Sequence, residues 1–180
     1  MNLIRLSTPD MTVADGRTIT GLAVPYGEWT DIVDVEGAYR EQFAPGTFER
    51  SIRERGDKIK LLALHDGRSF PIGKAISLRE DPAGLYAEFR LAETERGEEA
   101  LSLVRDGIVD GLSVGFSPLR SDWSADRSEV IRREARLNEI SLVGSPAYDD
   151  ARVLALREDL NIPTLSPADA IDRWLAIGGK

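Results

Sequence analysis

A serine stands between two glycines in Gly-Leu-Ser-Val-Gly-Phe at 111–116, and its hydroxyl is a candidate nucleophile. A serine hydroxyl attacks a carbonyl efficiently only when a neighbouring base removes its proton. His65 is the one histidine of the chain. Imidazole titrates near neutral pH, so this side chain can accept the proton and return it to a leaving group. Ser113 and His65 together indicate acyl transfer through a covalent intermediate.

The spacing Gly-x-Ser-x-Gly also occurs in the nucleophile elbow of α/β-hydrolases, where a sharp turn joins a strand to a helix. The residues after Ser113 are Val-Gly-Phe-Ser-Pro, which do not favour a helix, and His65 precedes the serine instead of following it. An esterase or lipase of that fold is therefore not expected. As a strand, 111–119 presents Ser113, Gly115 and Ser117 on one small face, where glycine leaves room for a substrate backbone. An ordinary thin strand face is the alternative.

A third group should hold the imidazole in the right tautomer and stabilise its charged form. Glu139 is the candidate because it lies on the polar face of an apolar strand at 136–143. Asp66 follows His65 but points the other way on a straight strand, and Asp110 fits an exposed turn. By pattern alone, His65 could be a packed residue on the apolar face of its strand. Glu139 could likewise be an ordinary surface glutamate.

Short strands and helices must position these side chains. Apolar and polar residues alternate over 84–92, which is the period of a half-buried strand. A helix is predicted at 44–56 between Pro45 and Gly56, and another at 94–107 with Thr94 as its cap. The remaining extended segments are 17–24, 58–66, 70–81, 111–119 and 128–143, the last two joined by a polar turn at 120–127.

The number of strands indicates the fold class. Many short strands with two or three helices, and no regular alternation of strand and helix, predict an α+β or mainly β protein. We expect an antiparallel β-barrel or a strongly curved sheet flanked by these helices. The core is expected within 1–156. The segment 157–180 carries two prolines and is expected to be a C-terminal tail, with a short helix from Ser166 or a flexible end.

Composition limits the functions that this chain can have. Its 180 residues, 42% of them hydrophobic, suffice for one sizeable core. With no cysteine and one histidine it lacks the usual zinc ligands, and we expect neither a metal nor another cofactor. Asp149 and Asp150 are interpreted as solvated turn residues. A net charge of −8 opposes binding to nucleic acid. No apolar run reaches the roughly 18 residues that span a membrane, so we expect a soluble protein of the reducing cytoplasm.

Six sequence blocks occur in a fixed order between about 17 and 154. They are GLAVPYGE, EQFAPGTFERSI, LLALHD, PIGKAISLREDPAGLYAEFRL, ALSLVRDGIVDGLSVGF and LNEISLVGSPAYDDARV. In this order they resemble the prohead maturation proteases of HK97-type tailed phages and of related gene transfer agents. That family is related by fold to the herpesvirus capsid proteases, or assemblins. The resemblance therefore implies a herpesvirus-protease-like sheet, with 1–156 as the protease domain.

The resemblance also implies an activity. It is that of a serine endopeptidase inside the immature capsid, or prohead, in the host cytoplasm. The implied substrates are the scaffold or the scaffold-like arm of the major capsid protein, and often the protease itself. The family pattern places the base at His65 and the nucleophile at Ser113. Glu139 stands where the herpesvirus relatives use a second histidine, so it is the predicted third member of the triad.

The herpesvirus relatives suggest two further features. Backbone amides around Ser145, Ala147 and Tyr148 would form the oxyanion hole, and the protein would form a homodimer. The alternative function is a non-catalytic capsid-assembly or scaffolding module with the same barrel. The presence of a serine, a histidine and an acid at the matching positions argues against that alternative.

Overall fold

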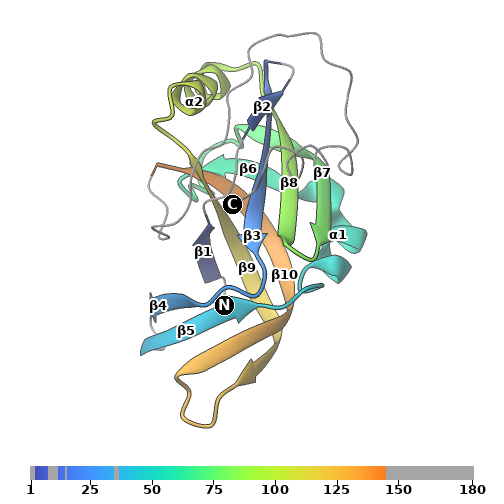
Figure 1. Cartoon of the computed structure of the whole chain (residues 1–180). Helices are drawn as coiled ribbons and strands as arrows, with labels where there is room; N and C mark the ends of the chain where they lie inside the picture. Colours follow the sequence, from blue (N-terminus) through green and yellow to red (C-terminus); the bar gives the residue numbers. More distant parts are fainter. Residues whose placement is uncertain (1–2, 8–11, 15, 35–36, 145–180) are drawn as a thin grey trace, which may run out of the picture.

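The computed structural model describes residues 3–7, 12–14, 16–34 and 37–144, and this part is mostly β with two α-helices (Figure 1). The strands are β1 (Leu3–Ser7), β2 (Thr12–Ala14), β3 (Thr18–Pro25), β4 (Thr30–Asp34), β5 (Gly37–Phe43), β6 (Lys60–Ala63), β7 (Gly73–Asp81), β8 (Gly84–Leu91), β9 (Gly111–Trp123) and β10 (Glu129–Val143). The helices are α1 (Glu49–Arg55) and α2 (Glu95–Arg105), with the 3₁₀ helix η1 (Gly56–Lys58) after α1.

Most of the predicted elements are confirmed. Strands β3, β7 and β8 lie within their predicted segments or one residue beyond them. The Oγ1 of Thr94 accepts a hydrogen bond from the backbone N–H of Gly97 at 3.2 Å, so Thr94 caps α2 as predicted. The turn predicted at 120–127 is wrong in its first half, because β9 continues to Trp123, which pairs with Val130. Strands β1, β2, β4 and β5 were not predicted.

All ten strands of the described residues belong to one sheet. Its order is β1-β9-β10-β6-β7-β8-β3-β2, with β5 also paired to β10, and β4 to β5. Figure 1 shows β9 and β10 as a long hairpin, with β4 and β5 near its turn. The antiparallel prediction is wrong at two places, since β10 runs parallel to β5 and to β6. Parallel neighbours need long crossover connections, and the chain between those strands and β10 is long enough to provide them.

The sheet is open in the described part of the chain. Its outermost strands, β1 and β2, do not pair with each other there, so the predicted barrel is not confirmed. The two α-helices agree with the predicted number of flanking helices. The predicted tail at 157–180 lies outside the described residues, including the helix predicted from Ser166.

The hydrophobic core fixes the orientation of β9. Leu112, Val114 and Phe116 are buried in a single apolar cluster with residues of β3, β8, β10 and α2. Burying a side chain of this size stabilises the fold by about 1.5–3 kcal/mol. Because side chains alternate along a strand, Ser113 and Gly115 must lie on the opposite face of β9.

A β-bulge decides which side chains of β10 reach that same face. The pairing of β10 with β9 shifts by one residue between Leu137 and Glu139, which makes Asn138 the extra residue. Leu137 and Ile140 are both fully buried, although strict alternation from Leu137 would bury Glu139 instead. The bulge resets this alternation. Glu139 therefore lies on the sheet face that carries Ser113.

Candidate active site

Two neighbouring strands hold Ser113 in place. It pairs with Leu6 of β1 on one side and with Ser141 of β10 on the other. Because β9 is paired on both sides at this position, the backbone of Ser113 has little freedom. The predicted strand in place of a nucleophile elbow is confirmed, since Ser113 lies within β9.

His65 lies just beyond β6, in a turn. Strand β6 ends at Ala63, and Leu64 and His65 both have left-handed backbone conformations, with φ of 52° and 57°. The strand predicted at 58–66 would have placed His65 on its apolar face; this placement is wrong, because the turn carries the imidazole to the Ser113 face. The N–H of Leu64 donates to the carbonyl of Leu142 at 2.9 Å and extends the contact with β10 into the turn. Left-handed non-glycine residues cost about 1–3 kcal/mol each, so surrounding contacts must hold the turn.

The three residues singled out in the sequence form one hydrogen-bonded line. His65 Nε2 lies 2.6 Å from Ser113 Oγ, and His65 Nδ1 lies 2.7 Å from Glu139 Oε1. An ionised carboxylate can only accept, so Nδ1 carries the ring proton and donates it to Glu139. Nε2 of the neutral ring is then an acceptor for the Ser113 hydroxyl. This arrangement can draw a proton from Ser113 and stabilise the imidazolium that results.

The line is sheltered from water. The side chains of His65 and Glu139 are 16% and 14% exposed, and Ser113 has no exposed surface. Hydrogen bonds are electrostatically stronger in such surroundings than in water. A substrate carbonyl can reach Ser113 Oγ only after the groups that cover it move.

Two further residues surround the Glu139 carboxylate. Its Oε2 accepts a hydrogen bond from the Ser141 hydroxyl at 2.6 Å. A Cβ atom at Gly115 would lie 2.3 Å from Oε1, so the carboxylate occupies the space that glycine leaves. The prediction that this space admits a substrate backbone is therefore wrong. Ser141 was not singled out, although it lies two residues after Glu139 and hence on the same strand face.

The alternative acid Asp66 has another role. It accepts hydrogen bonds from the backbone N–H of Arg68 at 3.0 Å and from the Ser69 hydroxyl. The bond from Ser69 is the main reason that the pKa of Asp66 lies below its ordinary value. Asp66 thus closes the turn that follows His65.

The predicted oxyanion-hole residues Ser145, Ala147 and Tyr148 lie outside the described residues, as do Asp149 and Asp150. Within the part of the chain that the structure describes, no three His, Cys, Asp or Glu side chains gather closely enough to hold a metal ion. No helix in that part is long and apolar enough to cross a membrane.

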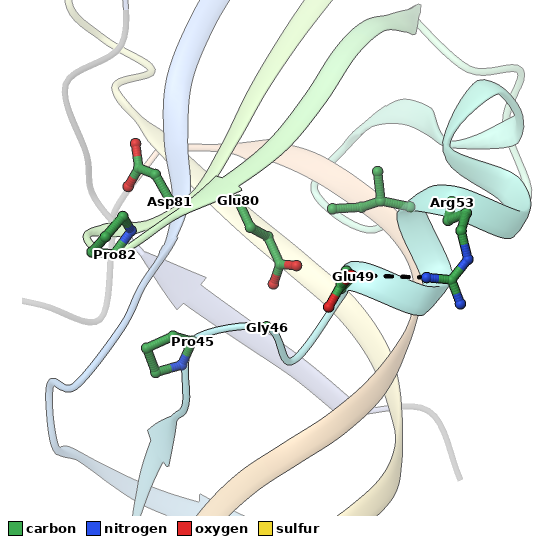
Figure 2. A pocket seen from close by; sticks show the side chains of 8 residues that line it. Pro45, Gly46, Glu49, Arg53, Glu80, Asp81 and Pro82 are labelled. Atoms are coloured by element: carbon green, nitrogen blue, oxygen red, sulfur yellow. Dashed lines mark ion pairs between the residues drawn. The ribbon is translucent and has the colours of Figure 1, made fainter. Parts of the chain in front are cut away.

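A separate hollow of about 740 Å³ lies between α1 and the β7–β8 turn (Figure 2). Glu49 and Arg53 form an ion pair of 3.8 Å at its wall. Glu80 accepts hydrogen bonds from the backbone N–H of Phe48 at 2.9 Å and from the Tyr26 hydroxyl. These side chains already bond to other groups of the fold. The lining residues are Pro45, Gly46, Glu49, Ile52, Arg53, Glu80, Asp81 and Pro82, none of them in the Ser113 line.

Comparison with known proteins identifies the family. Residues 4–162 match the sequence model of the family described as Caudovirus prohead serine protease. Because the match covers most of the chain, this protein belongs to that family, which confirms the resemblance found in the sequence.

Individual relatives agree with this membership. The prohead protease of Enterobacteria phage HK97 is 29% identical over 133 residues, which cover 73% of this chain and 58% of the relative. The prohead protease of Escherichia phage T5 is 32% identical over 91 residues, covering 51% and 42%. The chain therefore spans about half the length of these curated relatives. The solved structure of the bacteriophage T4 capsid assembly protease has a similar fold, with a TM-score of 0.58 and 13% identity over 81% of this chain and 98% of that one.

Proposed function

We propose that this chain is a serine endopeptidase of phage capsid maturation, with Ser113 as nucleophile, His65 as general base and Glu139 as the acid that orients the imidazole. The observation that carries the proposal is the hydrogen-bonded line from Ser113 Oγ through both ring nitrogens of His65 to Glu139. Membership of a serine protease family supports peptide bonds as the substrate class.

The mechanism follows from the roles of these three groups. Ser113 Oγ attacks the carbonyl carbon of the scissile bond while His65 Nε2 takes its proton, and the imidazolium then gives that proton to the leaving amine. Water, activated by the same imidazole, hydrolyses the acyl-enzyme ester. Glu139 stabilises the imidazolium in both steps. Donors for the oxyanion are proposed at backbone amides around 145–148, where one such donor can contribute about 3–4 kcal/mol.

The proposed substrates are proteins of the immature capsid. The scaffold, or the scaffold-like arm of the major capsid protein, would be cleaved inside the prohead in the host cell, and the protease would also cleave itself. The relatives of phages HK97 and T5 are named prohead proteases, and the T4 protein a capsid assembly protease, which supports this setting. A homodimer, as in herpesvirus relatives, is part of the same proposal.

A strongly curved, herpesvirus-protease-like sheet is the proposed finer description of the fold. Strand β3 lies close to β9, although four strands stand between them in the sheet order. In a flat sheet with about 4.8 Å between strands, the two would be about 24 Å apart. A crystal structure in which β3 lies far from β9 would reject this description.

The decisive experiment incubates the protein with its cognate major capsid protein and identifies the fragments by mass spectrometry. Wild-type protein should give defined fragments, and Ser113→Ala and His65→Ala should give none. Ser102→Ala changes an exposed serine of α2 and should cleave normally. Identical fragments from Ser113→Ala would reject the assignment. Intact mass of ageing wild-type and Ser113→Ala protein, compared side by side, tests self-cleavage.

A further inference from the structure

Ser141 is a buried hydroxyl at the centre of this site. It lies on β10, where it pairs with Ser113 of β9 and with Leu62 of β6, and it has no exposed surface. Side chains two residues apart on a strand share a face, so Ser141 lies beside Glu139. A hydroxyl that is removed from water in this way needs hydrogen-bond partners within the protein.

The partners of Ser141 fix the direction of each hydrogen bond. Its Oγ lies 2.6 Å from Glu139 Oε2 and 3.2 Å from the backbone nitrogen of His65. The carboxylate can only accept, so the Ser141 hydroxyl donates its single proton to Glu139. A lone pair of the same oxygen accepts from the His65 N–H. Each bond polarises the next in such a chain.

These bonds give the two oxygens of Glu139 different partners. Oε1 accepts from the His65 ring and Oε2 accepts from Ser141, so rotation of the carboxylate would break both bonds. The same hydroxyl also satisfies the N–H of His65, a residue in the left-handed turn after β6. The ring of His65 therefore bonds to the Glu139 carboxylate directly, and the main chain of His65 is connected to the same carboxylate through Ser141.

We propose that Ser141 is a positioning residue of the peptidase site: its hydroxyl locks the Glu139 carboxylate to the His65 turn, and so presents Nε2 to Ser113. The inference rests on the proposed function, because it assigns a role within the same triad. Ser141 acts through its two neighbours and does not touch the substrate.

The test compares Ser141→Ala with a matched control. Ser51, a residue of α1, is also buried. Its Oγ accepts a hydrogen bond at 2.9 Å from the N–H of Leu137, which lies on β10 as Ser141 does. Ser51→Ala therefore removes a comparable buried hydroxyl that bonds to no member of the triad in the described structure. Ser141→Thr keeps the hydroxyl at the site. Thermal unfolding of each variant establishes that it is folded.

Two readouts separate positioning from a structural role. The first is the rate at which a fluorophosphonate probe phosphonylates Ser113 Oγ with loss of fluoride, followed by intact mass. The second is the low-field NMR resonance of the His65 Nδ1–H. The chain has one histidine, so the imidazole signal needs no separation from others. Recorded in a Ser113→Ala background as well, this resonance reports on the Glu139–His65 contact without requiring catalysis.

Ser141→Ala should slow phosphonylation by about tenfold to a hundredfold, the size of the loss when a group that orients a metal ligand is removed. The Nδ1–H resonance should broaden through faster exchange with water. Ser141→Thr should stay within a few fold of wild type, and Ser51→Ala should move neither readout. If Ser141→Ala does not fold, Ser141→Cys, a weaker donor, should give a smaller loss of the same kind.

Two results would overturn the inference. One is a folded Ser141→Ala or Ser141→Cys variant with both readouts unchanged. The other is an equal effect of Ser51→Ala, which would reduce Ser141 to a structural hydroxyl. Failure of the proposed function looks different: the probe would not phosphonylate Ser113 in the wild type, while a resonance that still responds to Ser141→Ala would support the locking contacts.

Discussion

Gly115 faces Glu139 across the β9–β10 pair, and a methyl group at Gly115 would lie 2.3 Å from Glu139 Oε1. That oxygen is the one that accepts from the His65 ring. The absence of a side chain at Gly115 is therefore what lets the carboxylate reach the imidazole. This glycine is required for space, whereas most glycines in turns are required for their backbone angles.

Gly115→Ala should disable the site while the fold survives. The new methyl group displaces the Glu139 carboxylate, so the Nδ1 bond is lost or lengthened. We expect phosphonylation of Ser113 by the fluorophosphonate probe to slow by at least tenfold, with a cooperative thermal transition retained. Gly67→Ala is the control, because a Cβ there meets nothing within 4 Å. A phosphonylation rate equal to that of Gly67→Ala would show that the carboxylate does not need this space.

Glu139→Gln tests the charge of the third group. The amide can place its NH₂ toward Nδ1, which favours the tautomer in which Nε2 cannot accept the Ser113 proton, and it no longer stabilises the imidazolium. In another serine protease the equivalent change lowers the turnover rate by about 10⁴-fold. We expect a loss approaching this size in the rate at which the fluorophosphonate probe phosphonylates Ser113. Glu134→Gln, on the same strand but paired with Arg50, should react normally.

The residue types of this site were accessible from the sequence, but its geometry was not. The two-residue period of a strand and the order of the six sequence blocks singled out Ser113 and Glu139. Their meeting depends on the bulge at Asn138, which arises from pairing with β9 and leaves no local pattern. The left-handed turn at Leu64 and His65 is likewise imposed by tertiary contacts, since leucine does not favour such a backbone, although histidine is enriched in it.

Strand prediction failed where local patterns are weak. β2 has three residues, and β5, with the sequence GAYREQF, mixes apolar and charged residues. Such strands are specified by pairing with a partner strand more than by their own local pattern. β10 supplies that partner for β5. Parallel pairing of β10 with β5 and β6 could not be inferred either, because it joins segments far apart in the chain.

The left-handed backbone of Leu64 should make stability depend on side-chain shape. Leu64 is 71% exposed, so replacing it removes little packing. Asparagine tolerates this conformation, whereas isoleucine, an isomer of leucine, is branched at Cβ and does not. Leu64→Asn should unfold at the same temperature as wild type or higher, and Leu64→Ile at a lower one. A melting order with isoleucine above asparagine would mean that the turn is not strained in solution.

The buried ion pair of Glu41 and Arg132 should matter far more than an exposed pair nearby. Arg132 Nε donates to Glu41 Oε2 at 2.5 Å, with 3% and 1% of the side chains exposed. Glu41→Ala leaves the buried Arg132 cation without its carboxylate, and should lower the free energy of unfolding measured with urea by about 3–5 kcal/mol. Glu129→Ala breaks the half-exposed pair with Arg40 and should cost about 0–1 kcal/mol. Similar losses of unfolding free energy for the two variants would contradict the burial of the Glu41–Arg132 pair.

Tyr26 should make the protein sensitive to alkaline pH. Burial, together with the neighbouring Glu80, raises the pKa of Tyr26 well above its ordinary value of 10.0. Above that pH the unfolded chain loses a proton that the folded chain keeps, so the free energy of unfolding falls as pH rises. Urea midpoints measured from neutral to alkaline pH should show this slope in wild type. Tyr26→Phe should flatten the pH dependence of the urea midpoint, whereas Tyr86→Phe, at a partly exposed tyrosine, should not. Equal slopes in wild type and both variants would exclude Tyr26 as the source of the pH dependence.

The extra residue at 138 makes β10 one residue longer than β9 at this point. β10 enters the bulge with Leu137 turned inward and leaves it with Ile140 turned inward, so the two halves of the strand are offset by one position. Deleting Asn138 would remove the offset and leave Leu137, Glu139 and Ile140 in strict alternation, with Ile140 still in the core and Glu139 still on the Ser113 face. Distant members of this family should therefore be able to lose this one residue and keep the site, and their alignment through this strand should admit a one-residue gap here.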